Sequence, residues 1–342
     1  GYDGEHHKWY IEVLPFDLPK DSDTKEFFSP PLPYFLPSII DSVCDKSNEL
    51  NITDLNCTLI YGKITQVIQG IIFILIFFIL RNIAELIHPN NKEYFMALIL
   101  LFAMIPLSYK SFAMIRGEPY ISFFMFLSIN LIISICYKTK KINTKNIFLT
   151  GFFLGLMGLS RQWGLLFFPS LVVLLFFVLK DNEKKFNISF FRYSLFSFIV
   201  SLGVFGWFYA LLFIEYGSIT AFNREPSTFS FQNQTLSFYF GLGLEDIFSK
   251  PIRGFSMTNK VLPVLYADTW GDYWGYFTVT MGRGGLNTNY EIVPYLGRVN
   301  LFSLIPTVCF IAGIFLFIKN QKFMKRERLF YILIFSAINF IW

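Results

Sequence analysis

Two carboxylates and two histidines stand together at the start of the chain, in the stretch "DGEHH" that covers residues 3–7. The carboxylates of Asp3 and Glu5 are suited to act as general bases or metal ligands, and histidine can do the same near neutral pH. Adjacent histidines cannot both point to one face of a helix, so at most one of His6 and His7 joins Asp3. We expect a histidine that is structural or faces a substrate. The other interpretation is a divalent metal held by Asp3, Glu5 and His7, although hard cations prefer oxygen ligands.

The residues that follow predict how this cluster is positioned. Residues 5–14 mix apolar and aromatic side chains with charges and end before a proline, which predicts a short amphipathic helix at a membrane interface. On that helix Asp3, His7 and Tyr10 are spaced i, i+4 and i+7, so they share a face. The prolines of "FFSPPLPYFLPSI", residues 27–39, predict an extended, polyproline-like path that dips toward the membrane.

A second set of reactive side chains lies in the motifs "RGEP" and "SRQW" at the ends of apolar segments. A guanidinium binds phosphate through two parallel hydrogen bonds, and charge close to a membrane is costly enough to indicate function. The alternative is a long side chain that only reaches to the interface. We favour function for Arg161, because it lies in a tight turn between two apolar segments. The predicted set that binds a donor phosphate or substrate is Arg116, Glu118, Arg161, Gln162, His7 and Tyr10.

A third set lies in "ADTWGDYW", where Asp268, Trp270 and Asp272 alternate carboxylates with an aromatic ring. Aromatic residues are common anchors at the membrane interface, and this is one interpretation. A plain anchor has no use for carboxylates between the rings, whereas stacking combined with carboxylate hydrogen bonds holds sugars. We therefore include these three residues in the predicted substrate site.

The composition places these motifs in a membrane protein. Of the 342 residues 54% are hydrophobic and 15% are charged, and the mean hydropathy is +0.49, far from the values of soluble domains. Segments long enough to approach the roughly 20 residues of a transmembrane helix lie near 64–80, 94–109, 119–137, 147–160, 163–179, 189–214 and 300–318.

Basic residues indicate which face each connection occupies. The short segments 81–93, 138–146, 180–192 and 319–328 contain roughly half of the 29 Lys and Arg residues, which predicts that they lie on the cytoplasmic side. The net charge of +5 is then a topology signal, and we expect no nucleic-acid partner. The predicted organisation is one membrane domain over 1–342, with outer loops at 1–63 and 215–299 and transmembrane helices at 64–214 and 300–342.

The outer loops contain the cysteines Cys44 and Cys57, and an oxidising compartment would allow a disulfide between them. Cys136 and Cys309 fall in apolar segments and are expected to be buried as small apolar side chains. The chain begins at Gly1 without a methionine, and its last apolar run, 329–342, is too short to cross a membrane. We therefore expect a fragment cut at both ends.

The motifs "YDGEHHKWYI", "SPPLPYFLPS", "RGEP" and "GLSRQWGLL", in this order, resemble the GT-C superfamily of membrane glycosyltransferases. The likeness is greatest to the protein-mannosyltransferase and aminoarabinose-transferase branch. The "RQ" turn is also similar to the dolichyl-phosphate-glucose alpha-1,2-glucosyltransferases. The resemblance covers residues 1–180 motif by motif, and beyond that it rests on topology and "DTWGDYWGYF".

The resemblance implies an all-α, polytopic transmembrane bundle whose large outer loops carry short amphipathic helices. It implies that Asp3 is the acid of the first loop and a catalytic base, with Glu5, which completes a D-x-E pattern, as the other candidate base. Glu118 matches an acid at the start of a later helix, and Arg161 matches a basic residue that faces the donor phosphate. The chain departs from the pattern at Ser29, where histidine often precedes the two prolines.

These observations predict an integral-membrane glycosyltransferase that moves a sugar from a polyprenyl-phosphate donor to a lipid, glycan or protein acceptor. Its site would face the extracytoplasmic or lumenal side of a plasma, inner or endoplasmic-reticulum membrane. The alternatives are a transporter or flippase and a non-catalytic protein of envelope assembly. Transport needs polar groups near the membrane midplane, and the centres of the predicted spans are nearly free of charge.

Overall fold

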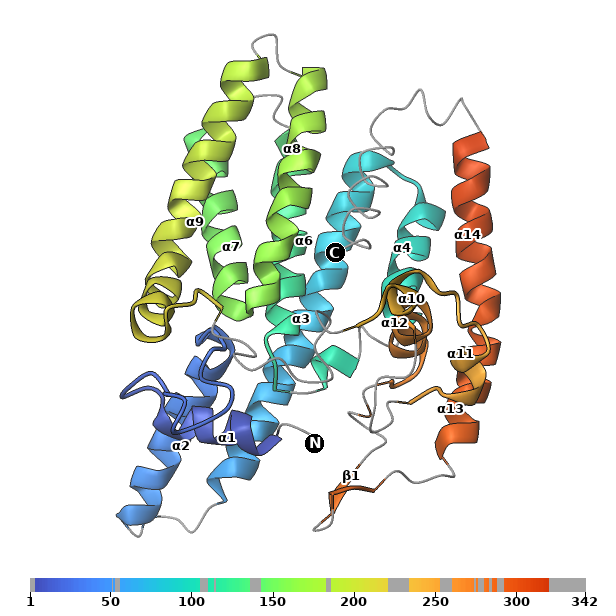
Figure 1. Cartoon of the computed structure of the whole chain (residues 1–342). Helices are drawn as coiled ribbons and strands as arrows, with labels where there is room; N and C mark the ends of the chain where they lie inside the picture. Colours follow the sequence, from blue (N-terminus) through green and yellow to red (C-terminus); the bar gives the residue numbers. More distant parts are fainter. Residues whose placement is uncertain are drawn as a thin grey trace. The chain divides into compact units, whose positions relative to one another are not determined.

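The computed structural model describes residues 4–50, 52, 56–104, 110–113, 115–135, 143–182, 186–220, 234–252, 260–273, 275, 280–282, 285–287 and 292–319 of the chain (Figure 1). By their contacts the residues form two compact units. The large unit contains His6–Phe102 and Ser111–Ala221, and the small unit contains Gly1–Glu5, Ala103–Lys110 and Phe222–Gln321. Each unit is described by itself, and the expectation of a single domain stays a prediction.

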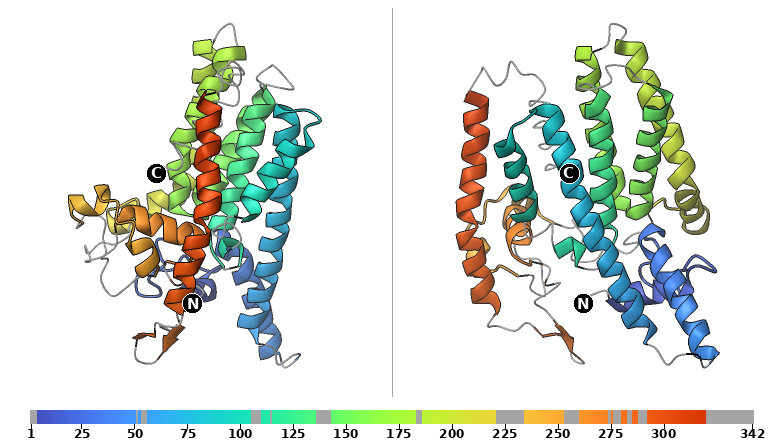
Figure 2. Two further views of the ribbon diagram at one scale, coloured as in Figure 1. Left: turned by 90° about the vertical axis from the view of Figure 1, so that its right-hand side faces the viewer. Right: turned by 180° about the vertical axis from the view of Figure 1, so that it is seen from behind.

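The large unit is built from helices whose apolar faces pack on one another. Packed neighbours follow the order α2, α3, α6, α7 and α9, and α8 packs on both α6 and α9 (Figures 1 and 2). The elements are α1 (Gly4–Val13), α2 (Leu32–Glu49), α3 (Cys57–Ile87), α4 (Lys92–Met104), α6 (Glu118–Ser134), α7 (Thr144–Ser160), the 3₁₀ helix η2 (Gln162–Phe167), α8 (Phe168–Asn182) and α9 (Phe186–Tyr216).

Four helical segments of the described chain are long and apolar enough to cross a membrane: Cys57–Ile87, Gln162–Lys180, Ile188–Tyr216 and Ile292–Gly313. They overlap four of the predicted spans, and α6 is a shorter apolar helix at the place of a fifth. The predicted span at 300–318 begins too late, since the helical segment there starts at residue 292. Residues 105–109, within another predicted span, and the run 329–342 lie outside the described residues.

The closest helix packing in the large unit lies between α7 and α9, where glycines replace side chains on α7. A Cβ atom on Gly151 would stand 2.5 Å from the carbonyl oxygen of Ser197, and one on Gly155 would stand 2.5 Å from Cβ of Val204. Small residues spaced about four apart allow such backbone approach in membranes, where packing and hydrogen bonds drive association. The glycines therefore bring the α7 backbone directly onto α9.

Hydroxyl groups join the same two helices. The Thr150 and Tyr193 hydroxyls are 2.6 Å apart, and the Tyr209 hydroxyl donates to the Gly158 carbonyl at 2.8 Å. Between α3 and α6, the Asn82 amide donates to the Asn130 side-chain oxygen at 2.7 Å. Such bonds satisfy polar groups that would be costly if left unpaired in lipid.

Helix α3 is longer than a membrane span requires. Its 31 residues extend about 46 Å at 1.5 Å per residue, against about 30 Å of hydrocarbon. Its first turns pack against α2, and the structure contains the predicted disulfide, with the Cα atoms of Cys44 and Cys57 5.6 Å apart. Helices α2 and α3 thus form a hairpin joined by a covalent bond. Cys309, expected to be buried, is exposed on α14 (Leu304–Lys319).

The prediction of an extended path over residues 27–39 is wrong for most of that segment. Helix α2 begins at Leu32 with Pro31 at its N-cap and Pro33 in its first turn. Proline is tolerated there because the first amide groups of a helix have no intrahelical partner. Pro37 lies inside α2, with its side chain buried. The extended path was expected because the segment contains several prolines, but prolines in the first turn of a helix are equally compatible with a helix.

The small unit contains α10 (Leu236–Phe240), α11 (Asp246–Ser249), α12 (Val261–Trp270), α13 (Ile292–Phe302), α14 and the antiparallel pair β1 (Thr280–Gly282) and β2 (Gly285–Asn287). Buried Asn300 on α13 connects the helices of the small unit. Its side-chain amide donates to the Ile247 carbonyl at 2.8 Å, and its backbone carbonyl accepts from the Tyr266 hydroxyl at 2.9 Å. Apart from this short hairpin, all regular secondary structure of the described chain is helical, and the prediction of an all-α fold is confirmed.

We expect Gly155→Ala to destabilise the large unit by about 1–3 kcal/mol, the usual cost of overpacking a close contact. Thermal unfolding in detergent, followed by loss of helical circular dichroism, measures the change. Gly203→Ala is the matched control, because Gly203 lies on α9, the partner of α7, and no neighbouring atom lies within 4 Å of its Cβ position. Equal melting temperatures for the two variants would contradict the packing assigned to α7 and α9.

Candidate functional site

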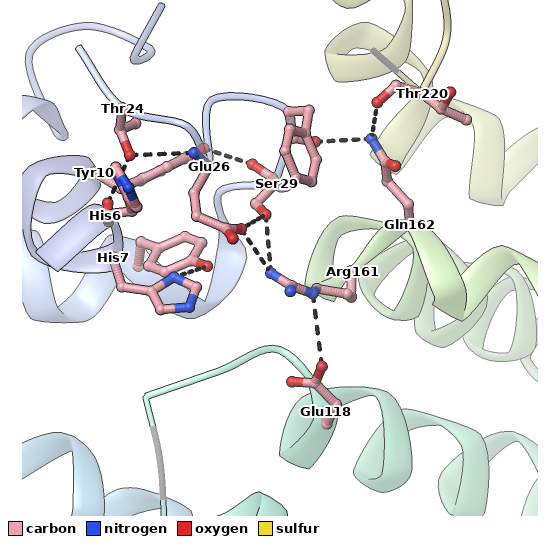
Figure 3. A network of polar contacts seen from close by, with 12 residues as sticks. His6, His7, Tyr10, Thr24, Glu26, Ser29, Glu118, Arg161, Gln162 and Thr220 are labelled. Atoms are coloured by element: carbon pink, nitrogen blue, oxygen red, sulfur yellow. Dashed lines mark hydrogen bonds and ion pairs between the residues drawn. The ribbon is translucent and has the colours of Figure 1, made fainter. Parts of the chain in front are cut away.

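A network of charged and polar side chains occupies one end of the helices of the large unit (Figure 3). It joins α1, the loop between α1 and α2, the first residue of α6 and the turn after α7. Arg161 directly precedes the membrane-length segment Gln162–Lys180, and Thr220 follows soon after the segment that ends at Tyr216. The network therefore lies where apolar helices end, the depth at which a membrane surface is expected.

Arg161 is positioned by the backbone on both sides of it. Helix α7 ends at Ser160 because Arg161 is extended, with φ −165° and ψ 150°, and the chain continues as η2. The start of α6 approaches this turn closely, since a Cβ atom on Gly117 would overlap the Ser160 carbonyl oxygen. The glycine of "RGEP" thus places Glu118 beside Arg161. The predicted tight turn at residues 160–162 is confirmed.

Glu26 and Ser29, from the loop before α2, hold the guanidinium of Arg161. Its Nη1 lies 3.1 Å from Oε2 of Glu26 and donates to Oγ of Ser29 at 2.9 Å, while that hydroxyl donates to Oε2 of Glu26 at 2.6 Å. The Arg161 and Glu26 side chains are only 13% and 12% exposed. The three groups form a closed triangle of charge-assisted hydrogen bonds.

The charges in this triangle stabilise each other. Burial alone would raise the pKa of Glu26, but the neighbouring His7 and Arg161 and the hydrogen bonds from Ser29 and Arg161 lower it overall. Burial alone would lower the pKa of Arg161, but Tyr34 and the two glutamates around it raise it overall. Both groups are therefore charged at neutral pH.

Glu118 contacts Arg161 from the opposite side, as Figure 3 shows, with Oε1 3.6 Å from Nε. Its side chain is 32% exposed, more than twice the exposure of Glu26. Its other oxygen, Oε2, is buried and has no hydrogen-bond partner within the described part of the chain. Glu118 is also the first residue of α6, where the helix dipole favours a carboxylate.

His7 and two tyrosines line the inner side of the network. The Tyr10 hydroxyl donates to the Ser29 carbonyl at 2.7 Å, and the Tyr34 hydroxyl lies 2.9 Å from Nδ1 of His7. The Tyr10 and Tyr34 rings stack with their centroids 4.2 Å apart. Both tyrosines are fully buried, and burial raises the pKa of each phenol. These contacts fix the buried face of α1.

The His7 imidazole is neutral at physiological pH. Its side chain is 7% exposed, and burial lowers its pKa to about 4, with Glu26, Arg161, Arg116 and Glu118 exerting smaller effects of both signs. Its Nε2 has no hydrogen-bond partner among the residues that the structure describes. A buried nitrogen without a partner is uncommon and requires an explanation.

Polar side chains of the network also connect the surrounding loops. Nε2 of Gln162 donates to the carbonyl oxygens of Phe28 and Thr220, at 2.8 and 2.6 Å. Arg116 is half-buried beside the start of α6, and its carbonyl accepts from Gln69 of α3 at 3.5 Å. The structure thus brings together six of the predicted residues: His7, Tyr10, Arg116, Glu118, Arg161 and Gln162.

The two predicted catalytic acids are not part of this network as described. Asp3 lies outside the described residues, and Glu5 is exposed in the first turn of α1. Within the described ranges, no group of three His, Cys, Asp or Glu side chains is arranged to hold a metal ion. A metal site that includes Asp3 stays untested, as does the role of either acid.

The third predicted set lies in the small unit. Asp268 and Trp270 are half-buried on α12, and Asp272 follows it and is buried. The Lys110 ammonium donates to the carbonyls of Asp268 and Gly271, so it caps the end of α12. Burial lowers the pKa of Lys110, and Asp268 and Asp272 oppose that shift. Lys110 thus lies close to two of the predicted carboxylates, whose role in a substrate site stays a prediction.

Sequence analysis missed Glu26, Ser29 and Tyr34. Ser29 and Tyr34 stand inside the motif "SPPLPYFLPS", but nothing in that motif indicates a contact with a distant arginine or histidine. Glu26 lies in "DSDTKEFF", where several acids are equally plausible partners for a distant arginine.

Comparisons of the chain with models of protein families, curated proteins and solved structures find no significant match. The resemblance to the GT-C superfamily therefore rests on the motifs alone.

We expect Glu26→Gln to lower the free energy of unfolding by about 3–5 kcal/mol, the cost of removing one partner from a buried ion pair. The loss arises because Arg161 stays charged and buried without its nearest carboxylate. Chemical unfolding in mixed micelles measures the change. The same substitution in the exposed Arg81–Glu85 pair of α3, Glu85→Gln, should have little effect. A similar stability for both variants would contradict the anchoring role of Glu26.

The lowered pKa of His7 predicts a loss of stability in mild acid. The unfolded chain takes up a proton near pH 6.5, whereas folded His7 does so only near pH 4, so stability falls as the pH drops through this interval. We expect a loss of about 1.5 kcal/mol between about pH 6.5 and pH 5. His7→Gln should remove this part of the pH dependence, and His6→Gln should retain it. Melting temperatures across this range provide the measurement, and an unchanged slope in His7→Gln would disprove the assignment.

Proposed function

We propose that the protein is an integral-membrane glycosyltransferase that takes a sugar from a polyprenyl-phosphate donor. The acceptor would be a hydroxyl group of a lipid, glycan or protein on the extracytoplasmic or lumenal face. The four membrane-length apolar helices support the membrane location. The assignment to the GT-C superfamily is part of the proposal and rests on the four sequence motifs.

The observation that carries this proposal is the placement of Arg161. It is a buried guanidinium immediately before a membrane-length helix, in contact with two carboxylates and near a second arginine, Arg116. A purely anchoring arginine would extend to water, but this one points into protein. An amphiphilic donor has a tail that fits beside apolar helices and a phosphate that fits arginine. The depth and chemistry of the site both match such a donor.

The proposed reaction forms one bond and breaks one. The acceptor oxygen attacks the anomeric carbon of the sugar, and the bond from that carbon to the phosphate oxygen breaks. Polyprenyl phosphate leaves with the electron pair, and its growing charge is stabilised by Arg161 and Arg116. A carboxylate takes the proton of the acceptor hydroxyl, and Asp3 is the predicted base, with Glu5 beside it.

The test offers the protein, in membranes, a panel of polyprenyl-phosphate sugars and follows release of polyprenyl phosphate by mass spectrometry. Asp3→Asn should reduce donor consumption by about 10²–10⁴-fold if Asp3 is the general base. Arg161→Lys should reduce it about tenfold or more, because lysine keeps the charge and loses the paired hydrogen bonds. Glu85→Gln, in an exposed ion pair of α3, is the control for expression and folding.

Two results would oppose the proposal. If the protein consumes no donor of the panel, the reaction class is wrong, and transport of a lipid-linked sugar or a role in envelope assembly becomes the better interpretation. If Asp3→Asn consumes donor as fast as the unchanged protein, Asp3 is not the base. Comparing the melting temperature of each variant with that of the unchanged protein shows whether a variant has lost catalytic activity or has failed to fold.

A further inference from the structure

The two carboxylates that contact Arg161 hold it unequally. Glu26 lies 3.1 Å from Nη1, shares the Ser29 hydroxyl with it and is 12% exposed. Glu118 lies 3.6 Å from Nε and is 32% exposed. The longer distance and greater exposure make the Glu118 contact the weaker one. Arg161 is thus anchored on one side and only lightly held on the other.

Some polar atoms of the network have no hydrogen-bond partner in the described structure. Oε2 of Glu118 and Nε2 of His7 are both buried and unpaired in the described structure. Glu118 contacts Arg161, and both of these groups influence the pKa of His7, so the three side chains belong to one electrostatic cluster. An unpaired, nine-tenths buried nitrogen beside an arginine is the arrangement expected where a ligand supplies the missing partner.

The hydrogen bonds around His7 indicate which kind of ligand fits. Tyr34 keeps its proton, because burial raises its pKa. Its hydroxyl can donate to Nδ1 of His7 at 2.9 Å. A neutral imidazole that accepts at Nδ1 carries its proton on Nε2, so Nε2 is a donor. With Tyr34 as the donor to Nδ1, both Nε2 of His7 and the guanidinium of Arg161 offer N–H groups, a combination that suits an oxyanion.

We propose that Glu118 leaves Arg161 when a phosphate binds, while Glu26 stays in place. The incoming phosphate oxygens would take the position of the Glu118 carboxylate on Nε of Arg161 and accept from Nε2 of His7. Glu118 and the phosphate carry like charges, so they compete for the same guanidinium. This inference deepens the proposed function by assigning Glu118 as the exchangeable carboxylate of the phosphate site.

The exchange predicts that removing a charged side chain from the site increases the affinity for phosphate. Glu118→Gln removes the competitor and should tighten phosphate binding by about two- to fivefold, the range expected for one partly exposed ion pair. His7→Phe should weaken binding, because it removes the Nε2 donor. Glu85→Gln, the same substitution in the exposed pair with Arg81, should leave binding unchanged.

Binding is measured on the full chain in detergent, with a polyprenyl monophosphate in mixed micelles as the probe and the shift in melting temperature as the signal. Inorganic phosphate is titrated separately, so a lipid-linked phosphate can be distinguished from a free one. Tighter binding in Glu118→Gln and weaker binding in His7→Phe would support the exchange. Weaker or unchanged binding in Glu118→Gln, or no binding of either probe by any variant, would overturn it.

This outcome is separable from that of the proposed reaction. If Glu118→Gln binds polyprenyl phosphate more tightly but the protein transfers no sugar from any donor, the exchange is supported and the proposed glycosyltransferase activity is disproved. If the protein transfers sugar in a reaction that needs Asp3, but Glu118→Gln binds phosphate no more tightly, the enzyme activity is supported and the exchange is disproved. The melting temperature of each variant without probe shows whether it is folded.

Discussion

The placement of one guanidinium at the end of apolar helices determines much of the large unit. A buried charge is stable only when it is paired and hydrogen-bonded. Arg161 therefore requires Glu26 and Ser29, which come from a loop more than 130 positions earlier in the chain. That loop can supply them only if Tyr10 and the rest of α1 hold its backbone, as the bond from Tyr10 to the Ser29 carbonyl does. The position of the loop that carries Glu26 and Ser29 is thus tied both to the charge of Arg161 and to the buried face of α1.

Helix packing also determines where Arg161 lies. The glycines of α7 allow it to pack directly on α9, so the end of α7 is held rigidly where Arg161 begins. Gly117 then allows the first residue of α6 to reach the same point. Small residues therefore act in two places, at the contact between α7 and α9 and at the polar end of the helices. The same physical property, the absence of a side chain, serves stability in one place and the geometry of the site in the other.

The features that sequence could predict are those that depend on local composition. Hydropathy placed the membrane-length helices, and the arginine between two apolar segments identified Arg161, because both signals are contained in a few neighbouring residues. Glu26 could not be chosen among the acids of its loop, since its role depends on a contact across 135 positions. The start of α2 was misjudged because proline favours either an extended path or a first helical turn. What decided between them was the packing of Tyr34 and Pro37, which is tertiary.

The charge balance of the network suits a substrate whose own charge changes during reaction. Arg161 contacts Glu26 and Glu118, and His7 is neutral because burial opposes its protonation. A sugar-linked polyprenyl phosphate carries one negative charge, whereas the released phosphate monoester approaches two, since its second pKa is about 6. Added negative charge beside His7 would favour its protonated form. In the proposed reaction the charge that the leaving group gains therefore raises the pKa of His7.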